Sequence, residues 1–201
     1  DGVPLFNAVR IGISSGAEPV FADCEDARQV DEYEWPNPDH LDFSEVLDTL
    51  RDAGDVYRMS GMWTCFFHIV ADYFGMENYF TKMHTHPEVV DAVTSKVCEF
   101  YFEANERFFA LAGDEVDAYF FGNDLGTQLS LMVSPQQIER FIMPWTKRFV
   151  QQGRSFGYQV MHHCCGSICP MIPRFIEIGI DALHPLQALA CDMDAETLAA
   201  G

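Results

Sequence analysis

From residue 55 onward, short apolar segments alternate with longer segments whose apolar residues recur at the spacing of a helix. We expect strands over residues 56–61, 116–121, 158–164 and 181–184. We expect helices over residues 62–74, 77–83, 87–112, 134–152 and 168–178. Parallel strands need a long crossover connection, usually a helix, so this alternation predicts an α/β fold with a parallel sheet. Both a (β/α)8 barrel and a doubly wound sheet satisfy the pattern.

Local signals mark the ends of the predicted helices. Pro87 stands where a first helical turn tolerates proline, and Gly113 should end the same helix. Ser134, followed by Gln137 three residues later, is a variant of the capping box. Pro144 lies inside the helix that Ser134 begins, so we expect a kink there.

The rest of the sequence indicates one domain with an irregular lead-in before its regular βα units. Residues 1–41 form an irregular lead-in, in which only residues 8–13 alternate like a strand. Residues 42–201 form the regular βα units and begin with a predicted helix over residues 42–53. A length of 201 residues suits one domain. The chain starts without Met and stops inside a predicted helix, so we expect it to be an internal segment of a longer protein.

Charge and cysteine content exclude several classes of partner. The net charge is -19, from 12 Lys and Arg against 31 Asp and Glu. This balance argues against nucleic acid and against an anionic membrane surface, because both attract clustered cations. No secretory signal and no apolar run long enough to span a bilayer occurs in the sequence. The seven Cys residues have no regular spacing, which indicates a reducing, cytoplasmic setting.

The predicted strand over residues 158–164 leads into four consecutive potential metal ligands: His162, His163, Cys164 and Cys165. Side chains alternate between the two faces of a strand, so His163 and Cys165 share one face. A catalytic zinc site usually has three protein ligands, and this pair could supply two of them. The alternative is a buried strand in which Cys serves as a small apolar residue.

A predicted helix follows closely after Cys165. We expect the free N–H groups at its start to favour the thiolate form of Cys165. A third zinc ligand would then be needed. Candidates after the next strand are Cys191, His184 and Asp192.

Further polar residues follow the other predicted strands. Asp124 comes after a buried strand, and we expect it to act as an acid/base or to accept a hydrogen bond from the substrate. A turn residue is the alternative. The candidate substrate-binding residues share positions after strand ends and are Asn123, Gln128, His184 and Gln187. His68 lies on an apolar predicted helix and should be a core histidine with its hydrogen bonds satisfied.

Several of these motifs, in this order and spacing, resemble the uroporphyrinogen decarboxylase family. The motifs are Phe121-Gly-Asn-Asp-Leu-Gly-Thr-Gln128, Ser134-Pro135, Pro144-Trp-Thr-Lys147, Val160-Met-His-His-Cys-Cys-Gly-Ser167, Ile176-Glu-Ile-Gly-Ile-Asp181, Pro185-Leu-Gln187 and Met193-Asp194. Upstream, Tyr33-Glu-Trp-Pro-Asn-Pro-Asp39 is similar to a connector of the methyltransferase-like members. The resemblance implies a (β/α)8 TIM barrel that is incomplete in this chain, with about four or five βα units.

Within that family, the His-x-Cys-Gly motif, here His163 to Gly166, marks the zinc-dependent methyltransferase branch. The resemblance implies that His163 and Cys165 bind zinc together with a Cys located beyond Gly201. It also implies a corrinoid, such as methylcobalamin, as co-substrate and a small thiol-type acceptor, with a corrinoid protein as a candidate partner. The extra His162 and Cys164 depart from the usual motif and leave the ligand assignment open.

Two other functions fit the same family. One is uroporphyrinogen decarboxylation in porphyrin biosynthesis, in which cations should hold the carboxylates of a tetrapyrrole. Few cations follow the predicted strand ends, which counts against this function. The other is a non-catalytic barrel that only binds a corrinoid or a partner protein.

Overall fold

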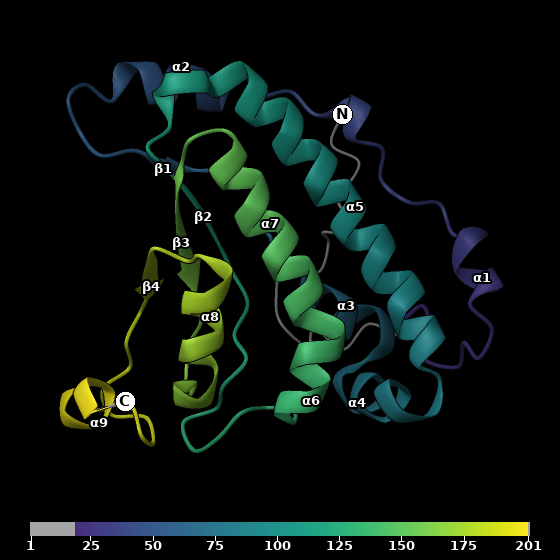
Figure 1. Ribbon diagram of the computed structural model, residues 1–201. Helices are drawn as coiled ribbons and strands as arrows, with labels where there is room; N and C mark the ends of the chain where they lie inside the picture. Colours follow the sequence, from purple (N-terminus) through teal and green to yellow (C-terminus); the bar gives the residue numbers. More distant parts are fainter. Residues whose placement is uncertain (1–18, 201) are drawn as a thin grey trace.

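The computed structural model describes residues 19–200, which contain a four-stranded parallel sheet (Figure 1). Its strands lie in the order β1 (Met59–Ser60), β2 (Ala118–Gly122), β3 (Gln159–His163) and β4 (Ala182–His184). A doubly wound sheet reverses its strand order at a switch point, whereas neighbouring strands of a barrel follow one another in sequence. The strand order therefore confirms the predicted α/β barrel topology, with four βα strands among the described residues.

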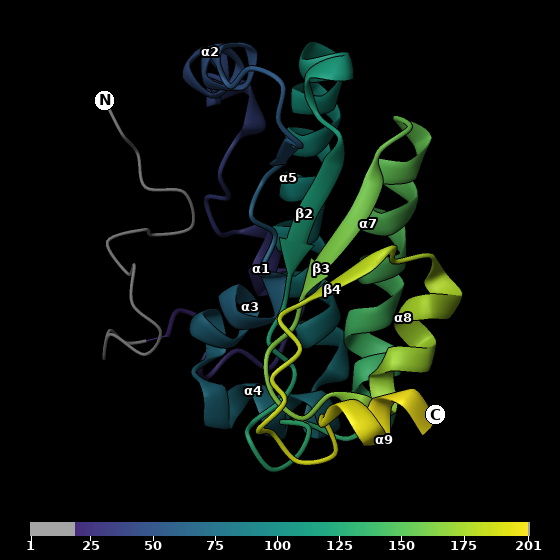
Figure 2. The ribbon, with the colours of Figure 1, turned by 90° about the vertical axis from the view of Figure 1, so that its left-hand side faces the viewer.

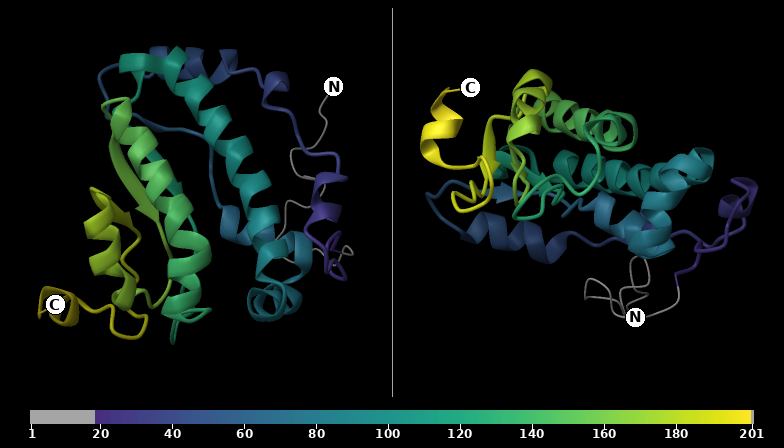
Figure 3. Two further views of the ribbon diagram at one scale, coloured as in Figure 1. Left: turned by 45° about the vertical axis from the view of Figure 1, so that its right-hand side comes forward. Right: turned by 90° about the horizontal axis from the view of Figure 1, so that it is seen from below.

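Helices connect each strand to the next. Their bounds are α1 (Arg28–Asp31), η2 (Pro38–His40), α2 (Ser44–Asp52), α3 (Phe66–Phe74), α4 (Met76–Thr85), α5 (Pro87–Ala112), η3 (Gly113–Glu115), α6 (Pro135–Gln137), η4 (Ile138–Ile142), α7 (Met143–Ser155), η5 (Cys169–Met171), α8 (Ile172–Ile178) and α9 (Ala195–Ala200). Of these, α1, η2 and α2 precede β1, and α9 follows β4. Helices α5, α7 and α8 cover one face of the sheet (Figure 2), and α5 lies beside α7 (Figure 3). Within residues 19–200, every helix is too short or too polar to cross a bilayer.

The predicted helix ends are confirmed where a local signal defines them. Pro87 begins α5, and Gly113 follows its last residue with a positive φ of 50°. Ser134 caps α6, because its side chain accepts a hydrogen bond from the backbone N–H of Gln137. Asp194 accepts a hydrogen bond from the N–H of Thr197 at the start of α9.

Some predicted boundaries are wrong. The helix predicted over residues 134–152 is interrupted by the π-helical turn η4, which directly precedes Pro144 in α7. Proline donates no hydrogen bond and its ring clashes with the carbonyl four residues earlier, so a wider turn accommodates it. Helix α3 begins at Phe66 rather than at residue 62. The strand predicted over residues 8–13 lies outside the described residues.

The core lies between the sheet and its covering helices. Tyr119 and Phe121 on β2 and Val160 on β3 are fully buried on this side. The ring centroid of Tyr119 lies 5.1 Å from that of Phe109 on α5. Its hydroxyl lies 3.0 Å from the Thr64 hydroxyl and accepts a hydrogen bond from Asn105 at 2.8 Å. The aromatic packing therefore fixes which strand residues face the opposite, concave side of the sheet.

Candidate metal centre

Three ligand-type side chains meet where β2 and β3 end. The carboxylate of Asp124, the imidazole of His163 and the thiol of Cys165 offer ligand atoms that all lie within 4.8 Å of one another. Nε2 of His163 is 3.2 Å from Oδ1 of Asp124 and 3.3 Å from Sγ of Cys165. All three residues are partly buried. The cluster thus lies at the carboxyl ends of parallel strands, where barrel enzymes carry their active sites.

A glycine in β2 allows the two strands to approach closely at this point. Gly122 pairs with His163 in the parallel ladder, and a Cβ on Gly122 would lie 2.2 Å from the carbonyl oxygen of His163. The N–H of Asn123 donates to the same oxygen at 2.9 Å. Any side chain at position 122 would push the strands apart. Asp124, two residues further on, is therefore held beside His163.

The connections after β2 and β3 also touch each other, and Figure 2 shows them running together from the strand ends. Gly166 has a positive φ of 89°, and a Cβ there would lie 2.4 Å from the backbone of Gly126. The N–H of Cys165 donates to Oδ1 of Asp124 at 2.8 Å. Backbone contact between two glycines therefore brings the carboxylate and the thiol together.

The neighbouring His162 and Cys164 point to the other face of β3, as the alternation predicted. His162 is only 1% exposed, and its ring lies between those of Phe121 and Phe175, at 4.8 and 5.1 Å. Burial lowers the pKa of His162 to about 3. Burial raises the pKa of the Cys164 thiol to about 12. Both side chains belong to the core, and neither reaches the cluster.

The expectation that a helix start would ionise Cys165 is wrong. The chain turns at Gly166 and becomes helical only at η5 and then α8, so Cys165 precedes the helical residues. Burial and the nearby Asp124 carboxylate raise the pKa of the Cys165 thiol to about 11. A thiolate at this position consequently needs a neighbouring cation to stabilise it.

The arrangement of the three groups suits a metal ion better than a proton relay. In a nucleophilic Cys–His–Asp arrangement, the carboxylate holds the ring nitrogen opposite the one that faces the thiol. Here both Asp124 and Cys165 lie at the same nitrogen, Nε2 of His163. Carboxylate, imidazole and thiolate are all zinc ligands. A divalent cation among them would offset the two negative charges that oppose each other without it.

The third ligands expected after β4 are not part of this cluster. Cys191 is exposed, and neither it nor Asp192 belongs to the ligand group found among the described residues. His184 contacts the other nitrogen of the His163 ring. The carboxylate of Asp124 lies close enough to the other two ligand atoms to serve as a third ligand, and its role as an acid/base stays a prediction. A Cys beyond Gly201, which the family resemblance implies, lies outside the described residues.

The predicted substrate-binding residues have different surroundings. Oε1 of Gln187 accepts hydrogen bonds from Gln128 Nε2 and from the N–H of Gly166, both at 2.9 Å. These two glutamines therefore join the connections beside the cluster, and their contact with substrate stays a prediction. Asn123 is 1% exposed, and its side-chain oxygen accepts a hydrogen bond from the N–H of Phe67 at 2.8 Å. This contact anchors the start of α3 and favours a structural role for Asn123.

Sequence reasoning missed two aromatic residues beside the cluster. The ring of Trp63 lies 5.4 Å from that of His163 and 5.3 Å from that of Phe120. Trp63 is 45% exposed, which is unusual for so large an apolar side chain. The sequence feature that could have indicated Trp63 is its position shortly after the strand β1 and Gly61, where site residues of a barrel lie. The helix predicted over residues 62–74 includes Trp63, whereas α3 begins only at Phe66.

His68 also differs from expectation. Burial lowers the pKa of this histidine. Both ring nitrogens are buried, and within residues 19–200 neither forms a side-chain hydrogen bond. The prediction of a fully satisfied core histidine is therefore wrong.

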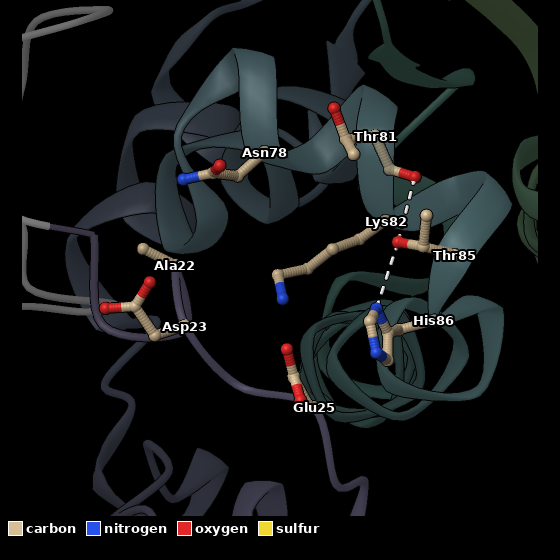
Figure 4. A pocket seen from close by; sticks show the side chains of 8 residues that line it. All are labelled: Ala22, Asp23, Glu25, Asn78, Thr81, Lys82, Thr85 and His86. Carbon is tan, nitrogen blue, oxygen red and sulfur yellow. Dashed lines mark hydrogen bonds between the residues drawn. The ribbon is translucent and has the colours of Figure 1, made fainter.

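A separate hollow of about 240 Å³ lies between residues 22–25 and α4 (Figure 4). The buried Lys82 extends into it and donates a hydrogen bond to the carbonyl oxygen of Cys24 at 2.7 Å. Asp23 and Glu25 also line it. None of the residues of the metal cluster contributes to this hollow.

Comparison with known proteins gives two matches. The family profile described as "Uroporphyrinogen decarboxylase (URO-D)" matches residues 8–196. The solved structure of a methyltransferase from Methanosarcina mazei superposes with a TM-score of 0.58 at 15% sequence identity, over 77% of this chain and 44% of that one. The chain thus spans less than half the length of this structural neighbour, and the low identity makes the likeness one of fold. The curated protein sequences contain no significant match.

Proposed function

Because this chain belongs to the uroporphyrinogen decarboxylase family, we propose that it acts in a zinc-dependent methyltransferase. The enzyme would transfer a methyl group from a methylcorrinoid, free or carried by a corrinoid protein, to a small thiol-type acceptor. The observation that carries the proposal is the convergence of Asp124 and Cys165 on Nε2 of His163. The structural likeness to a methyltransferase supports the same branch of the family at the level of fold.

Asp124, His163 and Cys165 are the residues of this chain that would hold the zinc. When bound, zinc supplies a Lewis acid that keeps a thiol ionised near neutral pH. His163 would bind as the neutral imidazole, with Nε2 as the ligand atom. The backbone N–H of Cys165 keeps the Asp124 carboxylate turned toward the cluster, through a 2.8 Å hydrogen bond. These residues would orient the acceptor sulfur toward the concave side of the sheet.

The aromatic residues beside the cluster suit a methyl-bearing co-substrate. Trp63 and Phe120 present apolar rings next to His163. Such rings can pack against a flat or apolar group and exclude water from the reacting sulfur. The transferred methyl carries no electron pair, so the acceptor sulfur supplies the electrons of the new bond. The pair of the broken cobalt–carbon bond stays with the corrinoid.

The charge of the surrounding segments favours methyl transfer over uroporphyrinogen decarboxylation. A tetrapyrrole with several carboxylates should be met by Lys or Arg side chains. The segments that follow the four strands contain neither residue type: 61–65, 123–134, 164–171 and 185–194. These segments offer carboxylates, thiols and amides instead, and His163 and His184 end the strands that precede two of them. Such groups suit a metal and a neutral or thiol ligand.

Metal content and methyl transfer together test the proposal. We expect the wild-type protein to bind zinc, and His163→Ala and Cys165→Ala to lose it. Cys191→Ser is the matched control, because Cys191 is exposed and lies outside the ligand group. A wild-type protein without zinc would contradict the mechanism, and zinc that survives both substitutions would contradict the ligand assignment. Zinc without thiol-dependent demethylation of methylcobalamin would point to another acceptor or to a binding role.

A further inference from the structure

The pairing of β3 with β4 places His184 directly beside His163. The two residues are register partners in the parallel ladder, so their side chains lie on the same face of the sheet. The N–H of Cys164 donates to the carbonyl oxygen of His184 at 2.9 Å and fixes this register. The position of His184 relative to the cluster is thus set by backbone pairing.

The two ring nitrogens of His163 face different partners. Nδ1 lies 3.0 Å from Nδ1 of His184, which is a hydrogen-bond distance. Nε2 faces Asp124 and Cys165 at 3.2 and 3.3 Å. His184 therefore approaches the ring from the side opposite the ligand cluster.

This geometry determines which nitrogen carries the proton when a metal is bound. A metal takes the lone pair of neutral imidazole on one nitrogen, and the proton then sits on the other. With Nε2 as the ligand atom, His163 donates from Nδ1 and His184 accepts at its own Nδ1. Metal-bound histidines commonly donate their second N–H to an acceptor that fixes the tautomer and ring orientation.

We propose that His184 is a positioning residue for His163 that holds Nε2 free for zinc by accepting the Nδ1–H hydrogen bond. This inference rests on the proposed zinc site. It differs from the substrate contact expected from the sequence, because the Nδ1 of His184 is engaged with a neighbouring imidazole. Phe120 supports the arrangement, with its ring centroid 5.7 Å from that of His184 at an angle of 82°.

Two substitutions separate the hydrogen bond from the bulk of the side chain. His184→Asn keeps an acceptor near the position of Nδ1, and His184→Leu removes it. We expect His184→Leu to weaken zinc binding about 10- to 100-fold, as is typical when a ligand loses its orienting partner. His184→Asn should bind close to wild type. His40→Leu, at an exposed histidine on η2, is the matched control.

Zinc affinity is measured on the whole chain by competition with a chromophoric chelator. Nitrogen-15 NMR of the zinc form then reports which nitrogen of His163 carries the proton. Zinc bound equally well by wild type and His184→Leu would overturn the role of His184 alone. A proton on Nε2 of His163 in the zinc form would overturn that role and also the assignment of Nε2 as the ligand atom. A wild-type chain that takes up no zinc would overturn this inference and the proposed zinc site together. Absence of methyl transfer with these zinc affinities intact would overturn only the proposed reaction.

Discussion

Gly122→Ala tests whether close strand contact builds the cluster. A Cβ at position 122 would lie 2.2 Å from the carbonyl oxygen and 2.4 Å from the Cβ of His163. Real Cβ contacts essentially never fall below 3.0 Å, so β2 and β3 must separate locally by about 0.8 Å. The distance from the backbone nitrogen of Asn123 to the carbonyl oxygen of His163 is 2.9 Å. The same shift would lengthen it to roughly 3.7 Å, which is beyond hydrogen-bond range.

Overpacking costs about 1–3 kcal/mol, and a lost hydrogen bond adds about 1 kcal/mol. We therefore expect Gly122→Ala to lower the free energy of unfolding by about 3 kcal/mol. The free energy of unfolding falls by about 2 kcal/mol for each molar of urea, so the urea concentration at the unfolding midpoint should fall by about 1.5 M. Urea titration followed by circular dichroism measures this midpoint, and zinc affinity should fall alongside it.

Gly153→Ala is the matched control in α7. Its Cβ would lie 3.1 Å from the Tyr119 ring, so that contact needs a shift of only a few tenths of an ångström, and Gly153 has no positive φ. Alanine also gains about 0.5–1 kcal/mol of helix stability over glycine, which offsets the tight contact. We expect a change of less than about 1 kcal/mol. Equal midpoints for Gly122→Ala and wild type would refute the argument that strand contact at Gly122 shapes the site.

Three further substitutions test the core and the cluster. Tyr119→Phe leaves the buried Asn105 amide without its acceptor, so the free energy of unfolding should fall by about 1–3 kcal/mol in urea titration. His162 has its pKa lowered to about 3, so below pH 6.5 the unfolded chain binds a proton that the folded chain does not. Between pH 6.5 and 4.5 the wild type should therefore lose about 2 kcal/mol more stability than His162→Phe, and parallel pH curves would contradict this. Asp124→Asn keeps an acceptor for the Cys165 N–H but removes a charge, so chelator competition should show zinc affinity reduced by roughly 100-fold or more.

Local sequence signals predicted the elements well where one residue type determines the backbone. The backbone conformations that Pro87 and Gly113 favour mark the two ends of α5. The side chain of Ser134 marks the start of α6 through its capping hydrogen bond. The structure confirms all three positions. The π-helical turn before Pro144 was not predicted, because several turn geometries can relieve the same proline clash. The strand alternation correctly separated His162 from His163, since it depends only on the backbone.

The candidate site was predicted less completely because it depends on contacts between distant segments. Asp124 and Cys165 are 41 residues apart, and they meet because Gly126 and Gly166 allow two backbones to touch. A sequence read one segment at a time does not reveal such a contact. The contact between Trp63 and His163 also joins distant segments, and Trp63 lies in the connection between β1 and α3 rather than in the helix predicted over residues 62–74.

The position of the ligand cluster couples metal binding to folding. Asp124 follows β2, His163 ends β3 and Cys165 follows it, so the cluster is complete only when β2 and β3 are paired. Pairing of β4 with β3 adds the contact between His184 and His163. A ligand that binds only the folded chain stabilises it, by about 2.7 kcal/mol at a free concentration of roughly 100 times its dissociation constant. Bound zinc would then stabilise the pairing of β2 with β3 in the middle of the sheet. A chelator that removes zinc would destabilise the same pairing that Gly122→Ala weakens.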